Sequence, residues 1–92
     1  MDVWIETTAG TLVKASATTH ISMRQTESGW DVSVSASAAP APFATGLADK
    51  AAARTVRNTL ALSMSTASTA EAPQVVVYDD QDLSVASYTL AA

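Results

Sequence analysis

Alternating apolar and polar residues near the start of the chain predict a β-hairpin. Residues 2–7 and residues 11–16 each alternate, and Gly10 separates them. A three-residue loop with a left-handed glycine is a common hairpin turn, so the two segments are expected to pair as antiparallel strands. The predicted cross-strand pairs are Val3 with Ala15, Trp4 with Lys14, Ile5 with Val13, and Glu6 with Leu12.

The clearest alternation lies in residues 19–27 and 30–37, which predict a second hairpin around a Ser28-Gly29 turn. Large apolar side chains occupy every second position of both segments. A slip of one residue would turn the apolar side chains of one strand to the polar face of the other, so burial restricts the register. The predicted pairs are Glu27 with Trp30, Met23 with Val34, and Ile21 with Ala36.

Residues 35–46 are interpreted as a connector because they contain two prolines, which interrupt both ladders and helices. Thr45 is the predicted N-cap of a helix over residues 46–64. On a helical wheel the basic residues lie on one side, which predicts a solvent-facing stripe. These basic residues are Lys50, Arg54 and Arg57. The face predicted to be buried carries Ala48, Ala52, Thr59 and Ser63, flanked by Thr55, Val56, Leu60 and Leu62.

The Ser-, Thr- and Ala-rich residues 65–72 are expected to be mobile. Residues 74–79 and 82–90 then predict a third hairpin. An odd-length turn at residues 79–81 places four apolar side chains on one face, whereas a two-residue turn mixes the faces. These side chains are Val75, Val77, Leu83 and Val85.

The expected fold is a single α+β domain over residues 1–92, with the order β-β-β-β-α-β-β. Its hairpins would form an antiparallel sheet or a half-rolled barrel, with the one helix packed on the apolar face. Trp4 falls on the face opposite Val3 and Ile5. Either the sheet curls enough to bury both faces there, or Trp4 marks an exposed apolar patch.

Composition narrows the possible functions. The 92 residues include no cysteine and one histidine, which exclude thiolate chemistry and a multi-histidine metal site within one chain. The formal charge is −4, and a negatively charged protein repels the phosphate backbone of nucleic acids, so nucleic acid is not an expected partner. An alanine-rich composition with only two lysines is typical of a high-GC bacterial genome. The N-terminal residues lack a signal-peptide pattern and no long apolar run occurs, so a cytoplasmic protein without membrane contact is expected.

Three aspartates lie close together in the sequence and form a candidate cation site, which we call the acidic turn: Asp79, Asp80 and Asp82. Clustered carboxylates suit calcium, but an EF-hand loop starting at Asp79 would need glycine and glutamate where Ser84 and Leu90 stand. The preferred interpretation is a solvated turn whose side chains cap backbone amides, with weak cation binding as the alternative.

His20 and the remaining polar residues give no concerted catalytic pattern. A histidine base needs a positioned nucleophile and an orienting carboxylate, and no Gly-x-Ser-x-Gly motif occurs. Neither a catalytic residue nor a cofactor is therefore expected. The interpretation of Lys50, Arg54 and Arg57 is a solvent-facing stripe, with docking of an acidic partner, such as the acidic turn of another copy, as the alternative.

The opening of the chain is similar to a type of small bacterial single-domain protein in which two β-hairpins precede a helix. The resemblance rests on the Val3–Thr8 and Gly10–Val13 segments, the His20-Ile21 strand and the Gly29-Trp30 turn, and it covers about the first 65 residues. These proteins have no known activity. The resemblance therefore implies the order of the hairpins and no functional residue.

Three functions remain, in order of preference. The first is a non-catalytic interaction or self-assembly module, either binding a protein partner or forming a homo-oligomer. Its expected interface residues are Trp4, Tyr88, Lys50, Arg54 and Arg57. The second is a small-ligand-binding domain with a pocket between sheet and helix, lined by tryptophan and tyrosine. The third is an acidic inhibitor that mimics nucleic acid, which requires the acidic residues to gather on one face.

Overall fold

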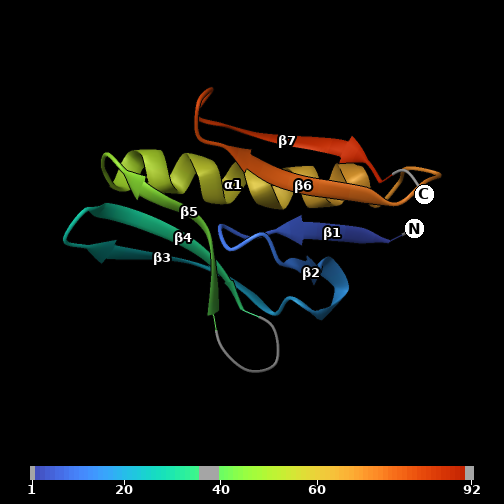
Figure 1. Ribbon diagram of the computed structural model, residues 1–92, viewed down its shortest axis with the longest axis horizontal. Coiled ribbons are helices and arrows are strands. Elements are labelled where there is room, and N and C mark those ends of the chain that lie inside the picture. The colour runs from blue at the N-terminus through green and yellow to red at the C-terminus, as the bar shows by residue number, and fades with distance from the viewer. Residues whose placement is uncertain (1, 36–39, 91–92) are drawn as a thin grey trace.

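The computed structural model describes residues 2–35 and 40–90, and it confirms the α+β class. Seven strands form two sheets, and one helix packs against strands of both (Figure 1). The elements are β1 (Val3–Glu6), β2 (Leu12–Lys14), a 3-10 turn (Ala15–Ala17), β3 (His20–Thr26), β4 (Gly29–Ser35), β5 (Pro40–Leu47), α1 (Lys50–Ala67), β6 (Gln74–Asp79) and β7 (Ser84–Thr89). Within the described ranges the strands do not close into a barrel.

The larger sheet has four strands in the order β2-β1-β6-β7. Antiparallel β1 and β2 pair Trp4 with Lys14 and Ile5 with Val13, which confirms the predicted register of the first hairpin. The predicted pair of Val3 with Ala15 is not formed, because Ala15 belongs to the 3-10 turn. The central pair, β1 with β6, is parallel and aligns Trp4 with Val75. A parallel pair needs a long crossover, and here the smaller sheet and α1 supply it.

The smaller sheet has the order β3-β4-β5, and its hairpin differs from the predicted register by two residues. Met23 pairs with Val32 rather than Val34, because the two-residue turn lies at Glu27-Ser28 and Gly29 already belongs to β4. A shift of two keeps every side chain on its predicted face. The predicted pair of Ile21 with Ala36 involves a residue outside the described ranges, and Ile21 pairs with Val34.

The predicted connector contains a fifth strand, β5, so the order becomes β-β-β-β-β-α-β-β. Pro40 and Pro42 are tolerated because β5 is an edge strand, where a missing N–H costs no ladder bond if it faces away from the partner. The carbonyl oxygen of Pro42 accepts a hydrogen bond from Thr8 N at 2.9 Å, which ties the smaller sheet to the loop after β1.

Helix α1 begins at Lys50, four residues later than predicted, and its N-cap is Asp49 rather than Thr45. The Asp49 carboxylate accepts a hydrogen bond from Ala52 N at 2.8 Å, the usual arrangement for an N-cap. Thr45 is unavailable because it lies within β5. At the other end residues 65–67 extend the helix, and hydrogen-bonded turns follow from Ser68 to Ala70. The mobility expected for residues 65–72 stays a prediction.

The buried face of α1 also differs from the prediction. It carries Ala53, Val56, Leu60 and Ala67. Leu62, expected at the margin of the core, is 68% exposed. Arg57 lies beside the buried face and is half-buried. A long arginine side chain can lie along apolar surface and keep its charge in water. The basic stripe of the helical wheel is therefore not centred on the side of α1 opposite the core.

The third hairpin has a longer turn than predicted, and its faces change accordingly. Tyr78 pairs with Val85 and Val77 with Ala86, so Val77 and Val85 lie on opposite faces. Val75 and Val76 are both fully buried even though neighbouring strand residues face opposite ways. The inner face of β6 therefore meets the core, and Val75 on the outer face is covered by its neighbours in the sheet.

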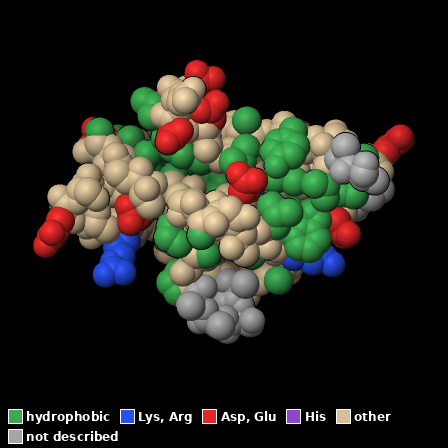
Figure 2. Space-filling model, viewed as in Figure 1, with side chains coloured by type: hydrophobic (Ala, Val, Ile, Leu, Met, Phe, Trp, Pro, Cys, Tyr) green, Lys and Arg blue, Asp and Glu red, His purple; other side chains and the backbone are tan. Residues whose placement is uncertain are grey.

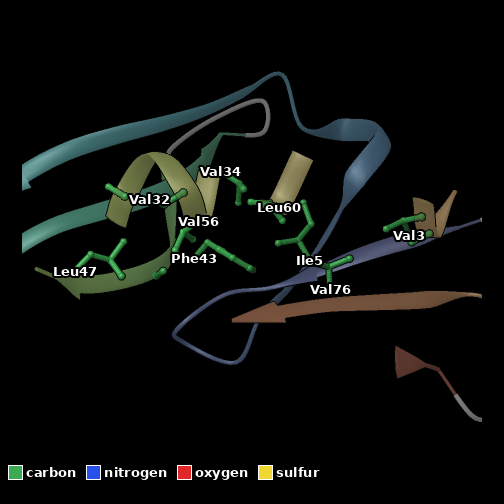
Figure 3. Packing of buried hydrophobic residues seen from close by; sticks show 12 residues of the cluster. Val3, Ile5, Val32, Val34, Phe43, Leu47, Val56, Leu60 and Val76 are labelled. Atoms are coloured by element: carbon green, nitrogen blue, oxygen red, sulfur yellow. The ribbon is translucent and has the colours of Figure 1, made fainter. Parts of the chain in front are cut away.

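The core joins both sheets to the helix (Figure 3). Ile5 and Val76 come from the larger sheet, Phe43 from β5, and Leu60 from α1; each is at most 2% exposed. The ring of Phe43 lies 6.2 Å from that of Tyr78 at an angle of 59°, a tilted arrangement that links β5 with β6. The two sheets and the helix thus pack around a shared apolar cluster.

Candidate functional site

The outer face of the larger sheet carries a row of aligned side chains, which we call the outer row: Lys14, Trp4, Val75 and Tyr88. Each member lies directly beside the next on neighbouring strands. Hydrophobic side chains gather on this face over β1, β6 and β7 (Figure 2). Trp4 is half-buried and Tyr88 is 46% exposed. Of the two readings of Trp4, the structure favours an apolar patch that is partly open to solvent.

Polar contacts surround the outer row without enclosing it. The Tyr88 hydroxyl lies 3.5 Å from Oε1 of Glu6, at the limit of a hydrogen bond. Lys14 Nζ lies 4.0 Å from Asp2 Oδ1, with both side chains about half exposed. Exposed pairs of this kind contribute little to stability. They leave Trp4 and Tyr88 partly accessible, whereas Val75 between them is fully buried.

Strand β7 forms a free edge of the larger sheet (Figure 1, red). Its sequence, Ser-Val-Ala-Ser-Tyr-Thr, contains no charge and no proline. Edge strands are commonly protected by lysine, proline or a bulge, because their unpaired backbone groups can join another chain. β7 has none of these protections over Ser84–Thr89, and most of its side chains are exposed.

The predicted interface residues fall into two separate groups. Trp4 and Tyr88 lie on the outer face, one on each side of Val75. Lys50 and Arg54 are exposed on α1, whereas Arg57 lines a cavity against β3. The fold therefore joins the two aromatic residues into one surface and does not join them to the basic residues.

The acidic turn has the geometry of its preferred interpretation. Oδ1 of Asp79 accepts hydrogen bonds from Gln81 N at 2.9 Å and from Asp82 N at 3.3 Å. Over the described residues, no group of three or more His, Asp or Glu side chains is arranged to hold a metal ion. Leu83, which ends this turn, has a φ of 54°, which is uncommon for a residue other than glycine.

His20 is exposed at the start of β3, and its Nδ1 lies 2.9 Å from Oγ1 of Thr19. The Thr19 hydroxyl donates to the carbonyl oxygen of Ser35 at 3.2 Å, so it is engaged in holding β3 beside β4. This threonine is a structural neighbour of the imidazole rather than a free nucleophile. No catalytic arrangement follows from these contacts.

An apolar groove opens between the end of β5, the first turns of α1 and the β6–β7 turn, with a volume of about 460 Å³. Leu47, Val56 and Leu83 provide apolar walls, and Tyr78 and Asp80 lie at its polar end. Burial, then the charges of Asp80 and Asp79, raise the pKa of the Tyr78 phenol above its usual 10.0. The groove contains a tyrosine as expected for a ligand pocket, but no tryptophan. A pocket between sheet and helix is one of the expectations from sequence, but the contribution of Leu47 is not, because the pattern of residues 35–46 predicts a connector rather than strand β5.

The acidic residues lie on several elements rather than on one face. Glu6 is on β1, Glu27 is in the β3–β4 turn, and Asp49 caps α1. Asp31 on β4 accepts a hydrogen bond from Gly46 N at 3.3 Å. This distribution gives no support to a nucleic-acid mimic. Within the described ranges, no helix is long and apolar enough to cross a membrane.

Comparisons with models of known protein families, with curated proteins and with solved structures find no match.

Proposed function

We propose that this chain is a non-catalytic self-assembly module in which β7 pairs with β7 of a second copy. The observation that carries the proposal is the free, uncharged edge of β7. Pairing such edges satisfies backbone groups on both copies and extends the four-stranded sheet across the interface. A second copy is the natural partner because a two-fold axis presents the same surface from both sides.

The backbone groups available on this edge can be identified. Leu90 N donates to the carbonyl oxygen of Pro73 at 2.8 Å, so Leu90 points its N–H toward β6. Backbone groups alternate in direction along an antiparallel pair, so alternate residues of β7 point theirs outward. These outward residues are Val85, Ser87 and Thr89.

The side-chain faces then favour one register. Directly opposed residues of an antiparallel pair share a face, so Val85 can oppose Ser87 or Thr89 of the second copy but not Tyr88. Opposing Thr89 gives the longer overlap of the two strands. Ser87 then lies on the two-fold axis and opposes itself, which a small uncharged side chain permits. All three outward residues form hydrogen-bonded pairs in this register.

The outer row supports the same arrangement. Pairing about a two-fold axis perpendicular to the sheet keeps the outer faces of both copies on one side. Tyr88 would then pack across from Ala86 of the second copy and lose part of its exposed area. This burial adds apolar stabilisation to the backbone pairing.

Sedimentation velocity across the micromolar range tests the proposal. The wild-type chain is expected to sediment as a dimer at the upper concentrations. Ala86→Lys places a charge at the joined edge, and Ser87→Pro removes an outward N–H that β6 does not use. Both variants are expected to be monomeric with an unchanged circular dichroism spectrum.

Ala51→Lys is the matched control, because Ala51 is exposed on α1 and gains the same charge away from β7. This variant should dimerise like the wild type. A wild-type chain that stays monomeric throughout, or a folded Ala86→Lys variant that still dimerises, would refute the proposal.

A second candidate function, binding of a small neutral apolar ligand, is favoured by the volume of the apolar groove. Fluorescence titration with N-phenyl-1-naphthylamine is expected to show saturable binding. Ala52→Leu, at a half-buried position lining the groove, should fill the space and abolish the signal, whereas Ala51→Leu, at the exposed neighbouring position, should not. Equal binding by both variants would place the dye elsewhere.

A further inference from the structure

Arg57 is a half-buried arginine with no carboxylate partner. Over the described residues, the ion pair found is Lys14 with Asp2, and no acidic side chain lies within 4.0 Å of the Arg57 guanidinium. Its Nε donates to Oδ1 of Asn58 at 3.1 Å, which leaves both terminal nitrogens available. A guanidinium whose terminal nitrogens have no acidic partner is suited to receive an anion.

A cavity of about 330 Å³ lies beside this guanidinium, between α1 and β3. Its polar lining comes from Arg57, Asn58, His20 and two threonines, and no carboxylate contributes. Because Asn58 Oδ1 already accepts from Arg57, the remaining polar atoms of that amide are the N–H donors of its nitrogen. Hydrogen-bond donors with a positive charge and no acid make the cavity complementary to an anion.

The contacts of Thr19 determine which nitrogen of His20 remains accessible to the cavity. The Thr19 hydroxyl has one hydrogen, and it donates to the Ser35 carbonyl. Thr19 Oγ1 also lies 2.9 Å from His20 Nδ1, so this ring nitrogen is engaged in a hydrogen bond with the threonine. His20 Nε2 is left for solvent or ligand.

Apolar side chains complete the cavity and restrict the kind of anion. Ile21 and Met64, both half-buried, line it together with Ala61. A fully hydrated inorganic ion would leave this apolar surface unused. A ligand with a charged head and a short hydrocarbon chain would use both parts of the lining.

We propose that this cavity binds small organic carboxylates with a short apolar chain. The carboxylate would accept paired hydrogen bonds from the terminal nitrogens of Arg57, a geometry that planar guanidinium and carboxylate groups share. The hydrocarbon chain would lie against Ile21 and Met64. The site lies on α1 and β3, away from β7, so it is independent of the proposed self-assembly.

Titration of the ¹⁵N-labelled chain followed by amide resonances tests this assignment, with sodium hexanoate as the probe. Saturable shifts are expected in residues 18–21 and 57–64. Hexan-1-ol retains the hydrocarbon chain without charge, and inorganic phosphate retains charge without the chain. Both are expected to give much weaker shifts at these positions.

Arg57→Gln is expected to weaken hexanoate binding about tenfold, the loss of one charge-assisted contact. Arg54→Gln is the matched control, since it removes the same charge from an exposed position one turn earlier on α1 and should leave affinity unchanged. Unsaturable or dispersed shifts, or equal affinity in Arg57→Gln, would overturn the site. Equal shifts with hexan-1-ol or phosphate would overturn the ligand class.

Discussion

Tyr78 shows how much one residue can depend on elements that are distant in sequence. Its phenol lies on β6, its ring faces Phe43 of β5, and the acidic turn follows it directly. Burial, then Asp80 and Asp79, raise the pKa of the phenol above 10.0. Each of these causes disfavours the phenolate, so the group prefers to stay neutral in the folded chain.

This raised pKa predicts how stability changes in alkaline solution. The unfolded chain releases the Tyr78 proton first, so the folded state binds more protons above pH 10.0, and the free energy of unfolding falls as pH rises. Urea denaturation on either side of this pH is the measurement. Tyr78→Phe should show a shallower fall than the wild type, and identical slopes would contradict the assignment.

Single positions also explain two errors of sequence interpretation. Asp49 is a strong N-cap residue, but the sequence pattern favours Thr45 because nothing in residues 43–47 indicates a strand. Arg57 was expected in solvent because charges usually mark the outer face of a helix. Its half-burial could not be inferred from the wheel, because it depends on where β3 lies.

At the scale of elements, the alternation of apolar and polar residues predicted the buried face of a strand better than it predicted which residues pair across strands. The second hairpin kept its predicted faces while its register differed by two residues, because burial is unchanged by a shift of two. The third hairpin failed differently. Val75 and Val76 are both buried, so β6 lacks clean alternation and its turn length could not be chosen from burial.

The pairing of β4 with β5 predicts a strict requirement for glycine at position 29. Gly29 has a φ of 136°, and a side chain there would collide with the carbonyl oxygen of Leu47. We expect Gly29→Ala to destabilise the fold by more than about 2 kcal/mol, since backbone strain and a backbone clash add together. Thermal or urea denaturation measures the change.

Gly10→Ala is the comparison variant for this prediction. Gly10 also has a positive φ, of 83°, but nothing lies within 4 Å of the added methyl group. Only the conformational cost remains, about 1 kcal/mol. Equal losses in the two variants would show that close approach of β5 to β4 is not what position 29 requires.

At the scale of the whole molecule, the proposed dimer would add stability to a core that contains few large side chains. The shared cluster is built largely from valine and alanine, with Phe43 as its largest fully buried side chain. Leu62 remains exposed on α1, which packs beside β7. Association through β7 would stabilise the fold by mass action, so the melting temperature should rise with concentration in the wild type and not in Ala86→Lys.

The sequence by itself determined the α+β class, two of the three hairpin positions with their buried faces, and the absence of thiol chemistry. These follow from local period and composition, which each short segment carries within itself. Only the tertiary structure decided that β1 and β6 pair in parallel, that a proline-containing segment becomes an edge strand, and that Arg57 meets His20 across a cavity. Such features depend on which distant segments share one core, and local alternation contains no information about that choice.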